Sequence, residues 1–570
     1  MVRFSPASFL RRRRRYQTID PDEIFIDAEN LPEFDKTQLE GRIERPLSRN
    51  AFRAFFIMTG FIGLVLAAQL VYLQIFRHTA LAARAEANTL SEISIVTTRG
   101  LIVDRNGALL AGNTATSDPQ FATRVYPLGD AAANLVGYVS YPKQDARGDW
   151  YQTTTQGVTG IEEAYDSALA GENGTRITET NAAGQDVSGT MVSAPVPGAD
   201  VHVSIDAGIQ QQLYENLHAR ADGSGYRGGA GVIMDITNGQ LIAVASYPSF
   251  DPTAMSSGQP AGTVQALLAD TRSPFLDRPV SGLYTPGSVV KPYLATAALN
   301  DHVISPDKQI LSTGSISVPN PYDPTHPSVF LDWRPNGWVD MRHAIAVSSD
   351  VYFYEVGGGF QNQPGLGISA IEKYMREYGF GTLTGVPLPN EADGVVPGPA
   401  WKAENFNGET WYLGDTYHTS IGQYGFKVTM MQLVRAVAAL ANGGTLVTPE
   451  IIEGQAGPTA TVPIPDSDLE VAREGMRLCV TINICGALNI PGIAVAGKTG
   501  TAQIGAHNQY MNSLIEGFFP YDHPRYAFAV VMEQGPTSAT QGAQWAMGQV
   551  LRWMMVNRPS MVGLATSTPS

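Results

Sequence analysis

The stretch PGSVVKPYLATAALN, residues 286–300, places a serine three residues before a lysine at the start of an apolar helical segment. On a helix, this spacing puts the Ser288 hydroxyl and the Lys291 amine on one face, a single turn apart and within hydrogen-bond reach. A serine hydroxyl is a poor nucleophile until a neighbouring base takes its proton, so this pair predicts a reactive serine. Pro292 fits a helix only near its first turn, because proline lacks the N–H that later turns require.

Two other segments have the same spacing, Ser140/Lys143 and Ser305/Lys308, although the chain has only eight lysines. Their internal prolines, in Ser-Tyr-Pro-Lys and Ser-Pro-Asp-Lys, favour turns over helices. Spacing alone is therefore a weak signal. The apolar helix that follows Ser288 favours this serine as the nucleophile.

Two further short motifs follow in order along the chain. Ser348-Ser349-Asp350 comes after an apolar run, Ala344-Ile-Ala-Val, and Lys498-Thr499-Gly500-Thr501 comes after another, Ile493-Ala-Val-Ala-Gly. Taken alone, the first is an ordinary polar capping cluster. Chance supplies one such motif easily but hardly three in this order, so we treat them as parts of one site.

Toward the N-terminus, residues 54–76 read AFFIMTGFIGLVLAAQLVYLQIF and contain no charged side chain. At about 1.5 Å per residue, a helix of this length spans the roughly 30 Å hydrocarbon core of a bilayer. A buried helix of a soluble domain is the alternative, but such helices rarely stay apolar on every side over this length. The long segment before it, which contains Arg11–Arg15, exceeds the n-region of a signal peptide. We therefore expect one uncleaved membrane helix.

The orientation of this helix is predicted from the positive charges on its N-terminal side, at Arg42, Arg45, Arg49 and Arg53. By the positive-inside rule, the N-terminus is expected in the cytoplasm. Everything after Arg77 is then expected outside, as in a single-pass protein of the cell membrane. The run Arg11–Arg15 is either a solvated topology signal or a contact with anionic lipid.

Composition divides the chain into a cytoplasmic tail, mostly disordered, over 1–50, the membrane helix over 51–77, a β-rich module over 78–205, a mixed α and β domain over 206–560 and a tail over 561–570. Within the fourth region, residues 231–246 predict a hairpin that turns at Asn238-Gly239. Residues 428–440 have helical apolar spacing, and residues 526–532 form a continuous apolar run typical of a buried strand.

Charge and cysteine content exclude several classes of protein. The net charge of −15, from 38 Lys+Arg against 53 Asp+Glu, does not supply the basic face that a nucleic-acid binder needs. Two cysteines, Cys479 and Cys485, are too few for a disulfide scaffold or a four-cysteine metal site. They are expected either to pair outside the cytoplasm or to remain two separate buried thiols.

On the three motifs together, the chain resembles the class B penicillin-binding proteins, which are membrane-anchored peptidoglycan transpeptidases, and within them the elongation type. Residues 99–107, 157–162 and 411–416 are also similar to segments of that family. The resemblance implies an α+β multidomain fold. It consists of the membrane helix, a β-rich pedestal of the dimerisation type over 78–205, and a transpeptidase domain over 206–560 with an antiparallel sheet flanked by helices.

The resemblance also implies a role for each motif residue. Ser288 is the nucleophile, and Lys291 is the base, which requires a neutral amine whose pKa is lowered by burial and by a nearby cation, Lys498. Ser348 bridges the two amines and relays a proton, and Asp350 stands where many relatives carry Asn. The substrate-binding residues lie on an edge strand: Thr499 binds the substrate carboxylate, Gly500 leaves room for the acyl chain, and the Thr501 N–H completes the oxyanion hole with that of Ser288.

In the reaction that this family implies, the serine attacks a D-Ala-D-Ala stem peptide, releases D-alanine and passes the acyl group to an amine of a neighbouring stem. β-Lactams are expected to acylate the same serine. A septal transpeptidase, a β-lactam sensor or hydrolase, and an inert scaffold are the alternatives. The expected partner is a SEDS-family glycosyltransferase in the membrane, contacted through the membrane helix and the pedestal.

No cofactor and no metal are expected. Some elongation-type relatives are described with a zinc site that uses a Cys inside the S-x-D triplet and a His in a preceding Gly-His-Gly. Here those places hold Ser349 and Asn336-Gly337-Trp338. His326 and His343 are interpreted as polar surface or packing residues, because the histidines lack ligand spacing.

Overall fold

The computed structural model of the chain describes residues 48–82, 90–114, 122–145, 150–180, 186–320, 323, 325–505, 507–539 and 541–564. The predicted cytoplasmic tail over 1–50 lies almost entirely outside this part. The chain divides into two compact units at the boundary between Thr89 and Leu90, and each unit is described by itself.

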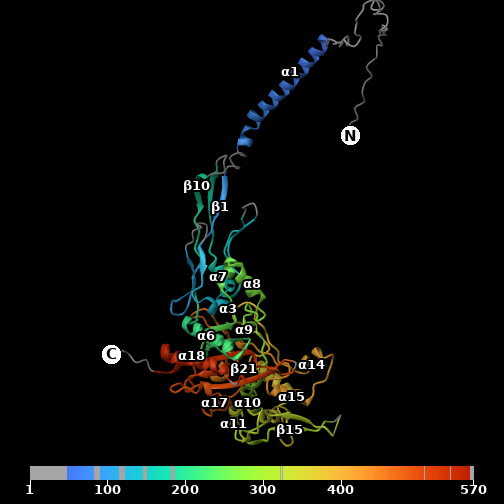
Figure 1. The fold of residues 1–570 in the computed structure, drawn as a ribbon, viewed down its shortest axis with the longest axis vertical. Coiled ribbons are helices and arrows are strands. Elements are labelled where there is room, and N and C mark those ends of the chain that lie inside the picture. Colours follow the sequence, from blue (N-terminus) through green and yellow to red (C-terminus); the bar gives the residue numbers. More distant parts are fainter. Residues whose placement is uncertain are drawn as a thin grey trace, which may run out of the picture. The chain divides into compact units, whose positions relative to one another are not determined.

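The first unit contains helix α1, Arg49–Val71, which continues as a short π-helix, η4, Tyr72–Phe76 (Figure 1). Ser48 caps its N-terminus, where the side chain accepts a hydrogen bond from the N–H of Ala51. None of its side chains is buried by other parts of the chain, and its mean hydropathy of 2.2 and its length suffice to cross a membrane. The helix predicted over 51–77 is therefore present, and its orientation stays a prediction.

The N-terminal part of the second unit is built from short strands, as predicted for the pedestal. One sheet has the order β1-β9-β10 and another the order β11-β2-β3-β4. The strands of these sheets are β1 Leu90–Ile95, β2 Ile102–Val103, β3 Leu109–Thr114, β4 Thr123–Val125, β9 Gly174–Thr180, β10 Asp186–Ser193 and β11 Val201–His202. Two small ladders pair β5 Val139–Ser140 with β8 Gln156–Gly157, and β6 Lys143–Gln144 with β7 Trp150–Gln152.

A buried carboxylate joins the two pedestal segments that the sequence singled out. Glu162, in helix α4 (Gly160–Ala164), accepts hydrogen bonds from Arg99 Nε at 2.6 Å and from Arg124 Nε at 2.7 Å. All three side chains are almost fully buried, so each charge depends on the others for its solvation. A Cβ at Gly157 would lie 1.9 Å from the Glu162 carbonyl oxygen, which explains why glycine stands there.

The centre of the second unit is a five-stranded antiparallel sheet in the order β13-β12-β22-β21-β20. Its strands are β12 Gly228–Asp235, β13 Leu241–Tyr247, β20 Ala496–Ile504, β21 Tyr510–Phe519 and β22 Tyr526–Pro536. The predicted hairpin is β12–β13, and the predicted apolar run is the central strand β22. β20 forms one edge of the sheet, which leaves its outer side open to a ligand strand.

Helices cover both faces of this sheet, which confirms the predicted fold class. Figure 1 shows α6 and α18 on one side of β21, and α10 and α17 on the other. On β22, Ala529 packs into the cluster that α10 and α16 share, whereas Phe528 packs into the α6 and α18 cluster, because side chains alternate along a strand. These helices are α6 Ala207–Ser224, α10 Lys291–Asn300, α16 Met430–Ala441, α17 Asp466–Thr481 and α18 Ala543–Asn557.

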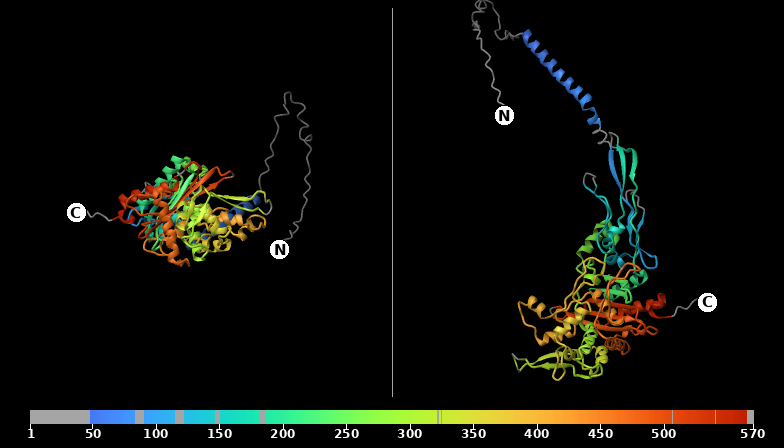
Figure 2. Two further views of the ribbon diagram at one scale, coloured as in Figure 1. Left: turned by 90° about the horizontal axis from the view of Figure 1, so that it is seen from below. Right: turned by 180° about the vertical axis from the view of Figure 1, so that it is seen from behind.

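The other elements surround this core (Figure 2). The helices are α3 Ala133–Val136, α5 Asp166–Leu169, α7 Pro252–Ser257, α8 Ala261–Ala269, α9 Arg278–Ser281, α11 Met341–Val347, α12 Asp350–Gly358, α13 Ile368–Glu377, α14 Pro399–Asn405 and α15 Leu413–Ser420, with 3₁₀ turns η5 Gly129–Ala132, η6 Gly287–Val290, η7 Gly486–Leu488 and η8 Pro559–Val562. Two-stranded ladders pair β14 Ile310–Ser312 with β17 Gly337–Val339, β15 Ser315–Val318 with β16 Ser328–Leu331, and β18 Thr445–Val447 with β19 Thr459–Thr461.

Two details near the C-terminus resolve or correct the sequence analysis. Cys479 and Cys485 form a disulfide with a Cα separation of 5.3 Å, so the structure has the bridged alternative. η8 contains residues 561 and 562, and Val562 is buried, so the predicted tail over 561–570 starts later than expected. A frayed end was expected from the Ser, Thr and Pro content, but Val562 anchors this turn in the core. Residues 565–570 lie outside the described part.

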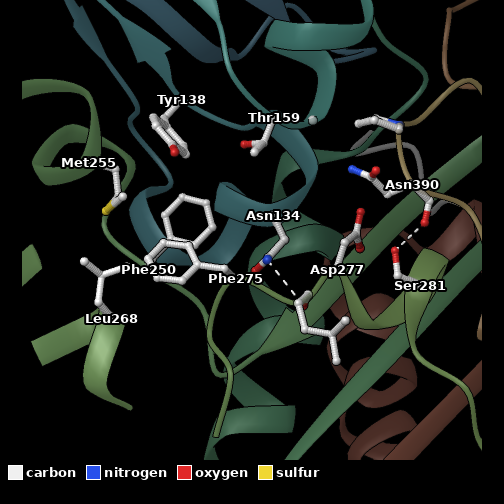
Figure 3. A pocket seen from close by; sticks show the side chains of 13 residues that line it. Asn134, Tyr138, Thr159, Phe250, Met255, Leu268, Phe275, Asp277, Ser281 and Asn390 are labelled. Carbon is white, nitrogen blue, oxygen red and sulfur yellow. Dashed lines mark hydrogen bonds between the residues drawn. The ribbon is translucent and has the colours of Figure 1, made fainter. Parts of the chain in front are cut away.

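A pocket of about 420 Å³ lies where the pedestal packs against the domain that follows it (Figure 3). Tyr138, Phe250 and Phe275 line its apolar end, and Asp277 lies at the other end with Asn390. Burial raises the pKa of the Asp277 carboxyl to about 7, and no other charge offsets this effect. In the folded protein this carboxyl is therefore mostly neutral below about pH 7 and mostly ionised above it.

This shift predicts a pH-dependent cost to stability that Asp277→Asn removes. Because the folded-state pKa exceeds the unfolded value, the folded protein binds more protons between these two values, and stability falls as the pH rises through this window. We expect the unfolding temperature of the variant to exceed that of the wild type by more at pH 8 than at pH 5, as measured by differential scanning fluorimetry. Asp522→Asn, at an exposed site, is the control, and an equal difference at both pH values would contradict this account.

Candidate active site

The three motifs meet at the edge strand: the first two lie at helix ends and the third lies within β20. Ser288 lies in η6, and α10 begins at Lys291, so Pro292 falls in the first helical turn, where a missing N–H costs nothing. α11 ends before Ser348 and α12 begins at Asp350. Helix termini therefore position the polar groups of the first two motifs.

Lys291 is fully buried and makes three short contacts. Its Nζ donates to the Ser348 carbonyl oxygen at 2.8 Å and lies 3.3 Å from the Ser348 Oγ. The third contact is an ion pair with Asp350 Oδ1 at 2.5 Å. Because Asp350 opens α12, the positive end of the helix dipole also stabilises its carboxylate.

Ser348 has a left-handed backbone, with φ 60° and ψ 41°, which is uncommon for a residue other than glycine. This conformation lets one residue end α11 and turn its side chain toward the edge strand. Its Oγ lies 2.9 Å from Lys498 Nζ, in addition to the contact with Lys291. One hydroxyl therefore joins the two buried amines.

Lys498 lies on β20 and is fully buried. Its Nζ also donates to the Thr499 carbonyl oxygen at 2.8 Å. Burial lowers the pKa of the Lys498 amine well below its ordinary value, and the positive charge of Lys291 lowers it further. The Lys498 amine therefore gives up its proton more readily than the amine of an exposed lysine does.

The sequence analysis expects Lys498 to be the cation of the site, whereas the structure lowers the pKa of this amine. Burial is the main cause, and the Asp350 carboxylate pairs directly with Lys291 and has no such contact with Lys498 among the described residues. The sequence places Lys291, Asp350 and Lys498 in one site but does not give the distances between them. The structure brings the side chains of Lys291, Ser348, Asp350 and Lys498 into contact and pairs the Asp350 carboxylate with Lys291.

Ser288 is half-buried, and its hydroxyl makes no hydrogen bond to another described residue. Thr499 is half-buried and Thr501 is exposed on the same edge strand, so this side of β20 is open to a ligand. η6 packs against β20, which brings the Ser288 backbone near Thr501: a Cβ at Gly287 would lie 2.9 Å from the Thr501 carbonyl oxygen. The nucleophile candidate is thus accessible, next to the strand predicted to hold the substrate.

Gly500 has a packing role that the sequence analysis did not assign. A Cβ at this position would lie 2.6 Å from the Pro286 carbonyl oxygen and 2.9 Å from Val289 Cγ1. Only glycine therefore allows β20 to approach η6 this closely. Its predicted role, making room for an acyl chain, is untested by this contact.

Sequence reasoning missed Asp332, which supports the second motif from behind. Its Oδ2 accepts hydrogen bonds from Ser349 Oγ at 2.8 Å, from Ser312 Oγ at 2.9 Å and from the Val351 N–H at 3.1 Å. This carboxylate fixes the turn between Ser348 and Asp350 to the β14–β17 ladder. An isolated aspartate in a loop carries no sequence signal for such a role.

The remaining candidates lie elsewhere. Ser140 is in β5 and Lys143 in β6, while Lys308 donates to Gln363 Oε1 at 2.7 Å, so neither pair shares a helix face. His326 and His343 are exposed, and each contacts a nearby aspartate. Within the described ranges, no group of three His, Cys, Asp or Glu side chains is arranged to hold a metal ion.

Comparison with known families places both parts of the second unit. The model of the penicillin binding protein transpeptidase domain matches residues 229–552, and that of the penicillin-binding protein dimerisation domain matches residues 119–203. The peptidoglycan D,D-transpeptidase MrdA of Acinetobacter baumannii is 28% identical over 88% of this chain and 86% of its own length. The protein of the same name from Haemophilus influenzae is 30% identical over 74% of this chain and 68% of its own.

Two solved structures share the fold. PBP2 of Pseudomonas aeruginosa in complex with WCK 5153 has a TM-score of 0.67 and 30% identity, over 83% of this chain and all of that chain (100%). PBP2 of Helicobacter pylori in complex with MreC has a TM-score of 0.69 and 26% identity, over 82% of this chain and 99% of that chain. Both parts of the second unit thus have counterparts in known proteins.

The packing of Gly500 predicts a measurable cost for one added methyl group. We expect Gly500→Ala to lower stability by about 1–3 kcal/mol, as overpacking typically does, because the Pro286 backbone has to move. Gly223→Ala, on an exposed turn of α6 where a Cβ meets nothing within 4 Å, is the matched control and should not lower stability. Urea unfolding of both variants measures the difference. An unchanged midpoint for Gly500→Ala would show that β20 and η6 are not in tight contact.

Proposed function

The chain belongs to the penicillin-binding protein transpeptidase family, and we propose that Ser288 is the nucleophile with which it cross-links peptidoglycan stem peptides during cell-wall elongation. The relatives that it matches over most of their length are peptidoglycan D,D-transpeptidases by name. One observation carries the assignment of the site: a single hydroxyl, that of Ser348, joins two buried amines beside an accessible serine.

In this proposal, the ion pair with Asp350 stabilises a charged Lys291, while burial favours the neutral form of Lys498. An ammonium does not accept the proton of Ser288, so this state is inactive toward attack. The resting enzyme thus needs a step that frees the Lys291 lone pair.

Substrate binding supplies that step. The C-terminal carboxylate of a stem peptide, held by the Thr499 hydroxyl, adds a negative charge beside Lys498 and raises the pKa of its amine. One proton then moves from Lys291 to Ser348 Oγ while the Ser348 hydroxyl proton moves to Lys498, along contacts of 3.3 Å and 2.9 Å. The number of protons is unchanged. Lys291 becomes the neutral base and Lys498 the cation, the arrangement that the sequence predicts.

The chemical step then follows. Lys291 takes the Ser288 proton as Oγ forms a bond to the carbonyl carbon of the D-Ala-D-Ala peptide, and the tetrahedral oxyanion accepts hydrogen bonds from the Ser288 and Thr501 N–H groups. Collapse breaks the C–N bond, and the Lys291 proton passes to the departing D-alanine amine. An amine of a second stem peptide attacks the ester and restores the serine. β-Lactams stop at the ester because their leaving group stays attached.

Membership of this family also supports a cellular location and a partner for the enzyme. The helix α1 is long and apolar enough to anchor it in the membrane, and the arginines before it favour a cytoplasmic N-terminus with the catalytic domain outside. The PBP2 of Helicobacter pylori is a partner of MreC in a solved complex. For this chain, the resemblance supports a SEDS-family glycosyltransferase contacted through the membrane helix and the pedestal.

Replacement of Ser288 tests the assignment directly. We expect Ser288→Ala to abolish covalent labelling by a fluorescent penicillin, measured by gel fluorescence of the full-length protein in detergent. Ser140→Ala and Ser305→Ala, which change the other two Ser-x-x-Lys segments, are matched controls and should label like the wild type. An unchanged unfolding temperature shows that Ser288→Ala is folded.

Two outcomes contradict the proposal. Labelling that persists in Ser288→Ala would place the nucleophile elsewhere. Rapid release of hydrolysed penicillin by the wild type, many turnovers within the assay, would favour the hydrolase alternative over a transpeptidase, whose acyl-enzyme with a β-lactam is long-lived.

A further inference from the structure

A buried glutamate lies directly behind the candidate active site. Glu516 is on β21, and its Cα is paired with that of Lys498 on β20. Partners in an antiparallel pair point to the same face, with Cβ atoms about 5 Å apart. Their neighbours Ala496 and Phe518 pack into the cluster that α10 contributes to, so both side chains face α10. The carboxyl is thus next to the second amine of the site.

Few hydrogen-bond partners are available to the Glu516 carboxyl. The side chain is fully buried, Tyr293 on α10 donates its hydroxyl to Oε2 at 2.8 Å, and Oε1 has no hydrogen-bond partner among the described residues. The residue paired with Glu516 on the other neighbouring strand is Ala529, which offers no polar group. Among the described residues, Lys498 and Tyr293 are the titratable groups that act on this carboxyl.

The two lysines of the site therefore have one carboxyl each. Lys291 is paired with Asp350, which is partly accessible, whereas Lys498 is paired across the sheet with Glu516, which is fully buried. Burial raises the pKa of the Glu516 carboxyl and lowers that of the Lys498 amine, so the two are neutral together. In a low-dielectric interior, a neutral acid beside a neutral amine avoids the cost of two buried charges.

We propose that Glu516 is a positioning residue that acts through Lys498 and sets where the proton of the Lys291–Ser348–Lys498 chain resides. This proposal rests on the proposed function, because it assumes that Lys498 receives a proton through Ser348 when the substrate carboxylate binds. As a neutral acid, Glu516 leaves Lys498 unprotonated in the resting enzyme. Once Lys498 is protonated, the polar carboxyl group of Glu516 stabilises the resulting ammonium.

The charged and titratable groups around the pair allow the sign of the effect to be worked out. Lys291 and Asp350 act on Lys498 from α10 and α12, and Glu516 acts on it from β21. Asp350 and Glu516 raise the Lys498 pKa, and Lys291 lowers it. Removing the Glu516 acid therefore lowers the pKa of Lys498 further. Removing the Tyr293 hydroxyl raises the pKa of Glu516, which weakens its pull on Lys498 in the same direction.

The test is the pH profile of the second-order rate constant for acylation by a fluorescent penicillin, measured on the full-length protein in detergent. We expect Glu516→Gln, a nearly isosteric change, to move the acid limb to lower pH by about half a unit or more and to reduce the plateau severalfold. Tyr293→Phe should move the limb in the same direction by less. A purely structural role would lower the plateau and leave the limb in place.

The chain offers a matched control one strand away. On β22, Glu533 accepts a hydrogen bond from the Tyr284 hydroxyl at 3.1 Å, a similar Tyr–Glu pair whose neighbouring cation is Arg278 and not Lys498. Tyr284→Phe should therefore leave the acid limb within about 0.2 units of the wild type. If Glu516→Gln fails to fold, Tyr293→Phe decides alone.

An acid limb that is unchanged in both Glu516→Gln and Tyr293→Phe would overturn the inference while labelling of Ser288 continues. The inference would also be overturned if Tyr284→Phe moved the acid limb as far as Tyr293→Phe does. Failure of the proposed function is distinguishable, because the wild type would then show no labelling that depends on Ser288.

Discussion

The site depends on one constraint: two amines that are both removed from water share one hydroxyl. Two ammonium groups at 3.3 Å and 2.9 Å from the same oxygen, in an interior of low dielectric, repel strongly, so one lysine is neutral. The surrounding structure decides which one. Asp350 stabilises the charge on Lys291, and the closed face of the sheet denies water to Lys498. Fixed contacts set the position of the proton before substrate binds. The charge of a bound ligand is then able to change that position.

Keeping this constraint requires rigid elements at close approach. The left-handed backbone of Ser348 is held by Asp332, which anchors Ser349 and the start of α12 to the β14–β17 ladder. Gly500 lets the edge strand approach η6 at a distance that any side chain would prevent. A small displacement of either element changes the distances from the Ser348 hydroxyl to both amines. Residues that touch no substrate thus fix the geometry of the proton chain.

Much of this architecture is predictable because it follows from local patterns. The membrane helix, the β12–β13 hairpin, the α16 helix and the β22 strand are each encoded by apolar spacing and turn residues within one segment. The three motifs identify the site because their order is specific. What the sequence does not show depends on contacts between distant segments. Asp332 and Glu516 have no signal of their own, and the lowered pKa of Lys498 arises from burial and from the nearby charge of Lys291, which only the fold determines.

The side chain at position 350 affects the charges of the site, because an aspartate carboxylate carries a charge that an asparagine amide lacks. An asparagine there would still accept a hydrogen bond from Lys291 but would add no charge that favours an ammonium at this position. A carboxylate at 2.5 Å supplies that charge beside Lys291. In the proposed mechanism, the free energy needed to move a proton from Lys291 to Lys498 comes from the substrate carboxylate held by Thr499. An enzyme built in this way reserves its nucleophile for ligands that carry a correctly placed negative charge, which a terminal D-alanine and a β-lactam share.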